Sequence, residues 1–310
     1  MPLRTVKRDT ADTLSLEWIL HVQNYRLILD KKRCVGCQIC SLACPKEAVR
    51  VEKQPKIQGQ KTKKAKVDID LAKCNFCAIC DVLCPYGAIR VTSNGKHILS
   101  VVEKGSFPEL IRDISVNADK CPADLKQYAD VCPLGLIKAT VLASDELQVE
   151  NVQALNEKAG PKVKVDVEKE YCPCCGVCEV KLPHGAMHVR RFLSGKISVH
   201  QEKCPEGCTD CLDVCPITGA LYLSDGGKVN ANETFCVFCG ACKIVCPIDE
   251  ALDFKRTHVC HTPVRSGAWN KALERLTSPV EMIKELKTKG SLRARESVKK
   301  RVGLRVEQYA

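Results

Sequence analysis

The stretch CVGCQICSLACP, residues 34–45, holds four cysteines separated by two, two and three residues, with a proline directly after the fourth. The same spacing returns in CNFCAICDVLCP from residue 74 and in CVFCGACKIVCP from residue 236, while CPEGCTDCLDVCP from residue 204 has one extra residue in its first gap. Two weaker copies lie between these, CPADLKQYADVCP from residue 121 and CPCCGVCEVKLP from residue 172. A repeated supersecondary unit therefore decides the fold.

Short strands are predicted on both sides of the cysteine motifs. Apolar runs follow all six motifs (EAVRV, GAIRV, LIKAT, GAMHV, GALYL and EALDF), and alternating segments precede several of them (RLILD, KVDID, KVKVDVE, KISVH and KVNAN). Such patterning is typical of short strands. Each unit is predicted to be a strand, a cysteine loop, a short helical turn and a strand, an α+β arrangement. The basic KTKKAK at 61–66 is predicted to be an exposed insertion.

The intact spacing indicates iron–sulfur clusters. Three cysteines at steps of three residues can hold three corners of a [4Fe-4S] cubane, and the fourth, before the proline, points toward a neighbouring cluster. Structural zinc instead uses two separated cysteine pairs and does not require this proline. Thiolates are ligands that iron prefers, and a reducing cytosol keeps thiols free of disulfides. A cytoplasmic metal-binding protein is therefore expected.

The motifs resemble those of bacterial-type two-cluster ferredoxins, repeated as in archaeal polyferredoxins. This resemblance implies three tandem ferredoxin-like 2[4Fe-4S] modules followed by a helical basic C-terminal tail. The predicted boundaries are an N-terminal extension at 1–24, modules at 25–97, 112–193 and 196–258, and the tail at 259–310.

In such ferredoxins each cluster takes three cysteines from one motif and the fourth from the partner motif. For the intact pairs this rule predicts cluster 1 at Cys34, Cys37, Cys40 and Cys84, cluster 2 at Cys74, Cys77, Cys80 and Cys44, cluster 4 at Cys204, Cys208, Cys211 and Cys246, and cluster 5 at Cys236, Cys239, Cys242 and Cys215.

The two weak motifs complement each other under the same rule. Cluster 3 is predicted at Cys172, Cys175, Cys178 and Cys132. A sixth cluster would have only Cys121, because Leu182 occupies the crossing position and the middle ligand positions lie near Leu125 and Tyr128. Bulky apolar residues are expected to fill that volume. The predicted cofactors are thus five [4Fe-4S] clusters.

Three cysteines are left over: Cys121, Cys174 and Cys260. For Cys121 and Cys174, small buried thiols are favoured over a ligand or redox role. The HVCH stretch at 258–261 offers His258, Cys260 and His261, but no fourth metal ligand is in view.

The net charge of +11 does not indicate nucleic-acid binding. Residues 255–310 hold 14 Lys and Arg against 5 Asp and Glu, which leaves about +2 for the remaining chain. Five oxidised clusters with their thiolates would subtract roughly ten charges. No aromatic-basic sheet signature or recognition helix is present. No segment is long and apolar enough to span a membrane, so no membrane insertion is expected.

The tail is predicted to be helical. Leu273, Leu276, Val280, Ile283 and Leu286 recur at helical spacing, interrupted by Ser278 and Pro279, where a second helix can begin. Two interpretations stay open: a basic helix pair that covers the last module, or an arm that docks a partner.

The Cys-Pro-Cys-Cys loop, together with SGAWNKALERLTS at 266–278, looks like the polyferredoxin subunit of formylmethanofuran dehydrogenase. That resemblance implies pterin-dependent and other iron–sulfur subunits as partners, and electrons that feed carbon dioxide reduction in methanogenesis. No paired carboxylates, activated nucleophile or phosphate loop is apparent, so no catalytic site of its own is expected. The alternatives are a polyferredoxin of a hydrogenase complex and an iron–sulfur structural or redox-sensing scaffold.

Overall fold

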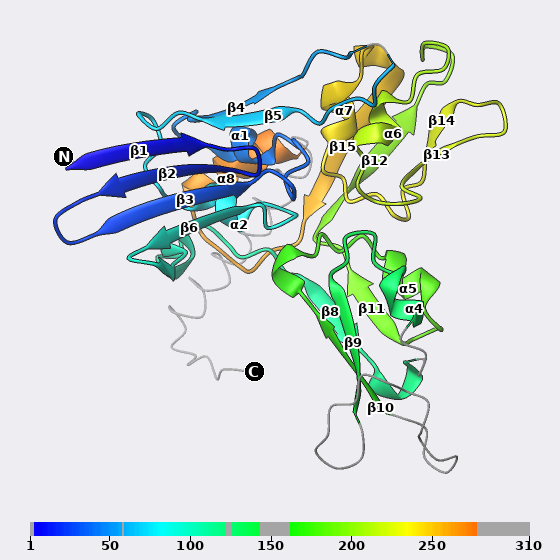
Figure 1. The fold of residues 1–310 in the computed structure, drawn as a ribbon, viewed down its shortest axis with the longest axis horizontal. Helices are drawn as coiled ribbons and strands as arrows, with labels where there is room; N and C mark the ends of the chain where they lie inside the picture. The colour runs from blue at the N-terminus through cyan, green and yellow to red at the C-terminus, as the bar shows by residue number, and fades with distance from the viewer. Residues whose placement is uncertain (1–2, 58, 122–125, 143–161, 278–310) are drawn as a thin grey trace, which may run out of the picture.

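One strand-pairing pattern occurs three times along the chain (Figure 1). The computed structural model describes residues 3–57, 59–121, 126–142 and 162–277. In each repeat, the strand before the first cysteine motif pairs antiparallel with the strand after the second motif, and the two strands between the motifs form an inner hairpin. We name the residues spanned by the outer pairs unit 1 (24–93), unit 2 (113–190) and unit 3 (193–259).

The strands of the three units coincide with the segments that the sequence pattern predicted. The outer pairs are β3 (Asn24–Asp30) with β6 (Ile89–Ser93), β8 (Asp113–Val116) with β11 (Met187–Arg190), and β12 (Leu193–Val199) with β15 (Leu252–Val259). The inner hairpins are β4 (Val49–Glu52) with β5 (Lys66–Ile69), β9 (Ile137–Leu142) with β10 (Lys162–Val167), and β13 (Leu221–Leu223) with β14 (Val229–Ala231). Strand β8 is the one member of these pairs that the pattern did not single out.

Each cysteine motif continues into one short helical turn. These turns are α1 (Ile39–Ala43), α2 (Ile79–Val82), α4 (Lys126–Ala129), α5 (Val177–Lys181), α6 (Asp210–Val214) and α7 (Ala241–Val245). The helices stay short because the proline after the fourth motif position cannot continue a helix. Three 3₁₀ turns precede a motif or a strand: η1 (Ala118–Lys120), η2 (Lys169–Tyr171) and η3 (Asp249–Ala251).

The first residues of the chain enlarge the sheet of unit 1. Strands β1 (Arg4–Asp9) and β2 (Thr13–Ile19) join β3, β6 and β7 (Lys96–His97) in a five-stranded antiparallel sheet of order β1-β2-β3-β6-β7. Leu14 and Leu16 are almost fully buried against the unit 1 core, with 1% and 0% of their surface exposed. The segment predicted as an extension, residues 1–24, therefore contributes strands to this sheet; the predicted module boundaries remain predictions.

The basic insertion of unit 1 is not simply exposed, which corrects the sequence-based expectation. The chain after β4 runs to unit 3 (Figure 1), where Thr62 is 8% exposed. The Thr62 backbone N–H donates to Asp213 at 2.9 Å, and its hydroxyl donates to Asp210 at 2.8 Å. Lys56 pairs with Asp210 as well. The insertion instead connects unit 1 with α6 of unit 3.

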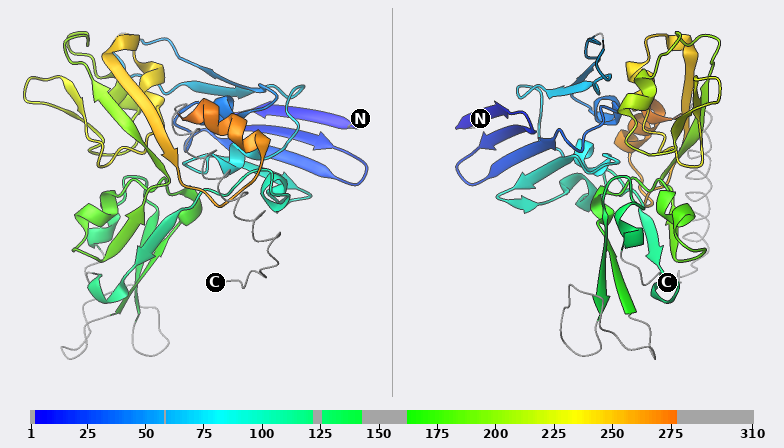
Figure 2. Two further views of the ribbon diagram at one scale, coloured as in Figure 1. Left: turned by 180° about the vertical axis from the view of Figure 1, so that it is seen from behind. Right: turned by 45° about the vertical axis from the view of Figure 1, so that its right-hand side comes forward.

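The end of the described chain returns to unit 1. Helix α3 (Ser100–Glu103) lies in the connection between units 1 and 2, and α8 (Gly267–Leu276) packs against α1 behind the view of Figure 1, as Figure 2 shows. The Ser266 hydroxyl caps α8 by accepting from Ala268 N–H at 3.2 Å. Trp269 is completely buried and meets Phe107 edge to face at 5.8 Å. The second predicted tail helix, from Ser278, lies outside the described residues.

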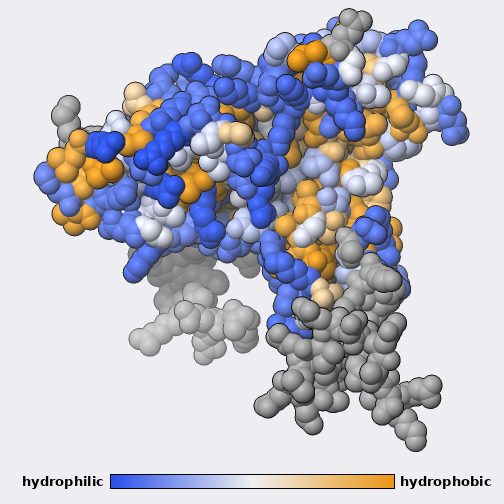
Figure 3. Space-filling model, viewed as in Figure 1, coloured by the Kyte–Doolittle hydropathy of each residue, from blue (hydrophilic) through white to orange (hydrophobic). Residues whose placement is uncertain are grey.

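The surface of the face seen in Figure 3 is mostly hydrophilic, with apolar residues gathered in separate areas. Within the described residues, no helix combines the length and apolar character needed to cross a membrane.

Candidate iron–sulfur centres

The fold gathers twenty cysteines into five groups of four, and each group contains three thiols of one motif and the crossing thiol of the partner motif. The neighbouring cysteines are those that the crossing rule combines, and their role as cluster ligands stays a prediction. We name the groups site 1 (Cys34, Cys37, Cys40, Cys84), site 2 (Cys44, Cys74, Cys77, Cys80), site 3 (Cys132, Cys172, Cys175, Cys178), site 4 (Cys204, Cys208, Cys211, Cys246) and site 5 (Cys215, Cys236, Cys239, Cys242).

Three of the groups line small cavities. The cysteines of sites 2, 3 and 4 surround cavities of about 20, 20 and 10 Å³, respectively. The remaining lining residues are mainly apolar, such as Ile69 at site 2 and Met187 at site 3. Sites from three different units thus share the same kind of lining, four cysteines among mainly apolar residues.

Left-handed backbone at one position gives the cysteine loops their curvature. The residue directly before the second cysteine has a φ between +54° and +70° in all five loops: Gly36, Phe76, Cys174, Gly207 and Phe238. This conformation turns its N–H toward the first cysteine, so Phe238 N–H donates to Cys236 Sγ at 3.4 Å and Cys174 N–H donates to Cys172 Sγ at 3.4 Å. Inward N–H groups of this kind form a concave nest for an anion.

The crossing cysteine of the weak motif has the same backbone environment as the intact ones. Leu136 N–H donates to Cys132 Sγ at 3.4 Å, as Ala48 N–H does to Cys44 Sγ at 3.3 Å and Ala88 N–H to Cys84 Sγ at 3.2 Å. In each case the donor lies four residues after the cysteine. Unit 2 therefore keeps the local geometry of a crossing ligand at Cys132.

The other half of unit 2 is packed with side chains. Leu182, at the crossing position, is 5% exposed, and Tyr128 is 2% exposed. Burial and a hydrogen bond with Cys121 raise the pKa of the Tyr128 hydroxyl. Val131 and Ala186 join the same buried cluster. Leu125 lies outside the described residues. Apolar side chains occupy this half, as the sequence predicted.

Two of the three cysteines outside sites 1 to 5, Cys174 and Cys260, lie in segments held by local hydrogen bonds. Cys174 is completely buried; its thiol donates to the Cys172 carbonyl at 3.9 Å and its backbone N–H donates to Cys172 Sγ, and the neighbouring Cys174 side chain and N–H lower the pKa of Cys172 to about 7, despite burial. Near Cys260, His261 donates through Nδ1 to the Thr262 carbonyl at 2.7 Å and accepts from Trp269 Nε1 at 3.2 Å. Both ring nitrogens of His261 therefore take part in hydrogen bonds, one of them with Trp269 of α8.

The five groups fit a cluster with a positive core. Burial and the neighbouring thiolates of Cys175, Cys172 and Cys132 raise the pKa of Cys178 to about 12. Burial raises the pKa of Cys236 to about 11. Four buried thiols that face one another resist ionisation unless a cation lies between them, and a coordinating metal deprotonates thiols outright. Within the described residues, no His, Cys, Asp and Glu side chains are gathered closely enough to hold a single metal ion.

The three units meet at one apolar cluster, which we call the junction. Its buried residues are Val35 and Tyr86 of unit 1, Cys175 and Val177 of unit 2, and Ile217, Ala220, Val237 and Ala241 of unit 3. Partly buried Cys37, Cys84, Cys215 and Cys239 pack against it. Sites 1, 3 and 5 therefore adjoin the junction.

Direct neighbours link these sites. The thiolates of Cys37 and Cys239 are close enough that Cys239, after burial, raises the pKa of Cys37. Arg112 connects sites 1 and 3, because it donates to the Cys84 carbonyl at 2.8 Å and to the Cys172 carbonyl. Sequence reasoning missed the junction, because no local pattern predicts how the units dock.

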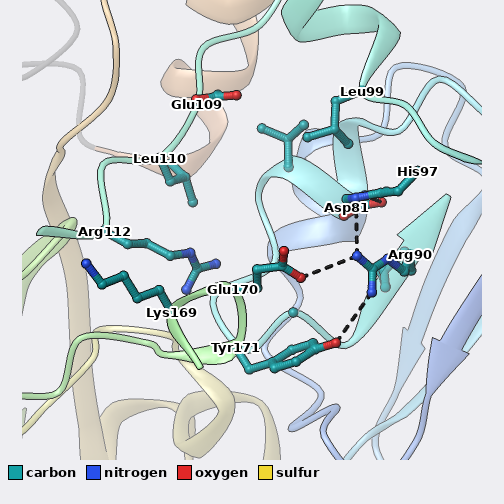
Figure 4. Close-up of a pocket in the computed structure, with 13 residues that line it drawn as sticks. Asp81, Arg90, His97, Leu99, Glu109, Leu110, Arg112, Lys169, Glu170 and Tyr171 are labelled. Carbon is teal, nitrogen blue, oxygen red and sulfur yellow. Dashed lines mark hydrogen bonds and ion pairs between the residues drawn. The ribbon is translucent and has the colours of Figure 1, made fainter. Parts of the chain in front are cut away.

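A solvent-accessible pocket marks the seam between units 1 and 2 (Figure 4). Arg90 pairs with Glu170 at 3.3 Å, and His97 with Asp81 at 2.9 Å. Gly87 has a φ of +57°, and a Cβ there would lie 2.6 Å from the Tyr171 ring. No cysteine lines this pocket, so its described residues join the units and do not form a further cysteine site.

Comparisons with known proteins agree with the cysteine pattern. Residues 33–88 and 196–250 each match a family model of a 4Fe-4S dicluster domain. The chain is an iron–sulfur protein with tandem ferredoxin-type domains. Together with the relatives described next, these domains make the chain similar to the polyferredoxins, which agrees with the resemblance noted in the sequence.

Three curated relatives match parts of the chain. An uncharacterized ferredoxin of Methanocaldococcus jannaschii is 34% identical over 33% of this chain and 62% of its own length. The polyferredoxin-like subunit of an aliphatic sulfonate oxidoreductase of Pyrococcus furiosus is 31% identical over 30% and 59%. The B subunit of anaerobic dimethyl sulfoxide reductase of Haemophilus influenzae is 37% identical over 19% and 33%. The matches thus span less than two thirds of each relative.

One solved structure matches most of the fold. A chain of the formate dehydrogenase–heterodisulfide reductase–formylmethanofuran dehydrogenase complex of Methanospirillum hungatei superposes with a TM-score of 0.75 and 28% identity, over 89% of this chain and 92% of that chain. The two matched dicluster domains account for four clusters at sites 1, 2, 4 and 5. Site 3 lies outside both.

Proposed function

We propose that the chain is an electron-transfer subunit that holds five [4Fe-4S] clusters at sites 1 to 5. Units 1 and 3 would each hold two clusters, and unit 2 would be a third ferredoxin module with one cluster. The observation that carries this proposal is the assembly of twenty cysteines into five groups of the same composition. Site 3 shares its four-cysteine, mainly apolar lining and its crossing-ligand geometry with the matched units.

Bound at these sites, a [4Fe-4S] cluster supplies a carrier for single electrons. The protein holds the clusters and separates them from water. The buried loops exclude water, backbone N–H groups donate to the ligand sulfurs, and apolar residues such as Val177 and Val237 fill the space between neighbouring sites. Such hydrogen bonds and burial tune reduction potentials. With four cysteines at every site, no iron is left open for a substrate, so catalysis falls to a partner.

The spatial order of the sites supports a relay. Site 1 adjoins site 5 through Cys37 and Cys239, and site 3 reaches the same junction through Cys175. Cys80 of site 2 adjoins Cys40 of site 1, and Cys211 of site 4 adjoins Cys242 of site 5. We therefore propose a line of sites 2, 1, 5 and 4, with site 3 as a side arm.

The partner that we propose is a formylmethanofuran dehydrogenase complex in the cytoplasm, with its pterin-dependent and iron–sulfur subunits. The support is the match to a chain of a complex of that description over 92% of that chain. The relative from Pyrococcus is also a polyferredoxin-like subunit of an oxidoreductase. A role in supplying electrons for carbon dioxide reduction follows from this partner.

Native mass spectrometry of the complex, isolated anaerobically from its own cells, tests both parts. We expect a cofactor mass that corresponds to five cubanes, and formylmethanofuran dehydrogenase subunits in the same assembly. Four cubanes would refute site 3. Hydrogenase subunits in the assembly would refute the partner, and clusters that dithionite cannot reduce would favour a structural scaffold.

A further inference from the structure

Two buried polar groups converge on site 5. The first is Arg256, whose side chain is 6% exposed. It donates to three backbone carbonyls: Phe238 at 2.9 Å, Leu276 at 3.5 Å and Cys239. In the described part of the chain, no carboxylate lies within ion-pair distance of Arg256. A buried guanidinium without a counter-charge is strongly unfavourable.

The thiolates of site 5, together with Cys37 of site 1, supply the missing counter-charge. Burial lowers the pKa of Arg256, whereas the thiolates of Cys37, Cys239, Cys242 and Cys236 raise it. Three of these four cysteines belong to site 5. A cluster with four thiolates carries a net negative charge that increases on reduction. The Arg256 charge therefore stabilises the reduced form more than the oxidised form.

The second group is the hydroxyl of Tyr86, at the junction. It is buried, and among the described residues it has no nitrogen or oxygen partner for a hydrogen bond. The side chain that it faces is Cys239, and Cys215 and Cys37 lie nearby. The hydroxyl can thus donate to a sulfur of site 5, and hydrogen bonds to sulfur raise cluster potentials.

The other sites have different surroundings. At site 2 the carboxyl of Asp81 adjoins Cys80. Arg112, between sites 1 and 3, is half-buried and has Glu170 nearby. Site 5 alone combines a fully buried cation with a donor hydroxyl among the sites that the structure describes.

We propose that Arg256 and Tyr86 are positioning residues that make site 5 the highest-potential centre of the chain, so that electrons collect at the junction from which three arms extend. The inference rests on the proposed function, because it requires a cluster at site 5. It adds a ranking of the sites by reduction potential, in which site 2 has a low potential.

The test is a redox titration of the anaerobically isolated full chain, followed by electron paramagnetic resonance. In the wild type, one cluster is reduced at a higher potential than the others, and Cys236→Ala removes that signal. Arg256→Gln lowers the reduction equilibrium constant of this cluster by about tenfold, or about 59 mV for one electron. Arg256→Lys, which keeps the charge, gives a smaller shift. Tyr86→Phe lowers the constant by about threefold.

Failure of the inference and failure of the proposed function are distinguishable. A wild-type chain with fewer than five clusters contradicts the proposed function. Five clusters with full iron content, and an unchanged high-potential signal in Tyr86→Phe, overturn the inference. If Arg256→Gln loses iron, the Tyr86→Phe titration decides alone, because it removes a single oxygen atom. Persistence of the high-potential signal in Cys236→Ala also overturns the inference.

Discussion

The two halves of unit 2 differ in what fills them and in where they face. The half that contains site 3 keeps four cysteines around a cavity and contributes Cys175 and Val177 to the junction. The other half has Leu182 and Tyr128 in the place of ligands. The same strand pairing continues through both halves. The comparison shows that buried apolar side chains can stand at ligand positions of a unit while its strand pairing is kept.

The largest expected effect comes from the two end cysteines of CPADLKQYADVCP. Cys132→Ala removes a ligand of site 3, so we expect iron to fall from about 20 to about 16 atoms per chain. Cys121→Ala, in the same motif, removes only a thiol in the packed half, and iron stays near its wild-type value. Iron analysis and native mass spectrometry check both variants. Equal losses in the two variants would contradict the assignment.

The packed half should behave as an ordinary core. Leu182→Ala leaves a cavity next to Tyr128, and we expect a destabilisation of about 2–5 kcal/mol without loss of iron. Val180→Ala, on helix α5 two residues before Leu182 and 61% exposed, is the matched control and should change stability by less than about 0.5 kcal/mol. Anaerobic urea unfolding followed by circular dichroism measures the difference. Loss of iron in Leu182→Ala would show that this half supports a cluster.

A smaller effect is expected at the seam that holds the retained half against unit 1. Gly87→Ala places a Cβ 2.6 Å from Tyr171, directly before Cys172, whereas Gly95→Ala meets open space. Both glycines have a positive φ, so both variants carry the cost of left-handed backbone. The overlap should make Gly87→Ala less stable than Gly95→Ala by about 1–3 kcal/mol. Equal unfolding midpoints of the two variants would mean that the seam between units 1 and 2 accommodates the added Cβ without strain.

The smallest expected effect concerns Cys174. Its thiol adjoins Cys172 and donates to the Cys172 carbonyl, but it lies outside the four cysteines of site 3. Cys174→Ala should therefore keep all iron and lower the reduction equilibrium constant of one cluster by about twofold to threefold. The redox titration described above measures it, with Cys121→Ala as the control. Loss of a cluster would instead make Cys174 a ligand.

Much of this structure could be predicted from local sequence, because each cysteine loop is formed by residues that are close together in the chain. The spacing of Cys74, Cys77 and Cys80 fixes three thiols within one turn, and alternation such as KVKVDVE marks a strand at β10. The crossing of Cys132 followed from the complementary losses in two motifs. These features depend on residues within about ten positions of one another or on a repeated pattern.

The features that sequence did not predict depend on contacts between distant segments. Nothing near Tyr86 indicates that it faces Cys239 of unit 3, and the basic character of residues 61–66 suggested solvent, although Thr62 is buried against Asp210. The pairing of β1 with β2, and of β2 with β3, was missed because TLSLEWI carries no cysteine motif to mark it. Docking surfaces are defined only once each unit has folded.

The contact of Cys37 with Cys239 means that chain order and spatial order differ: the first and third units are direct neighbours, although the second lies between them in the sequence. The proposed relay is therefore a branched network, in which the second unit is a branch and not a step on the main line. In a network of this shape, loss of a cluster at the end of a branch does not interrupt electron transfer between the other sites. Natural selection could thus replace one set of cysteine ligands by apolar side chains while electron transfer between units 1 and 3 continued.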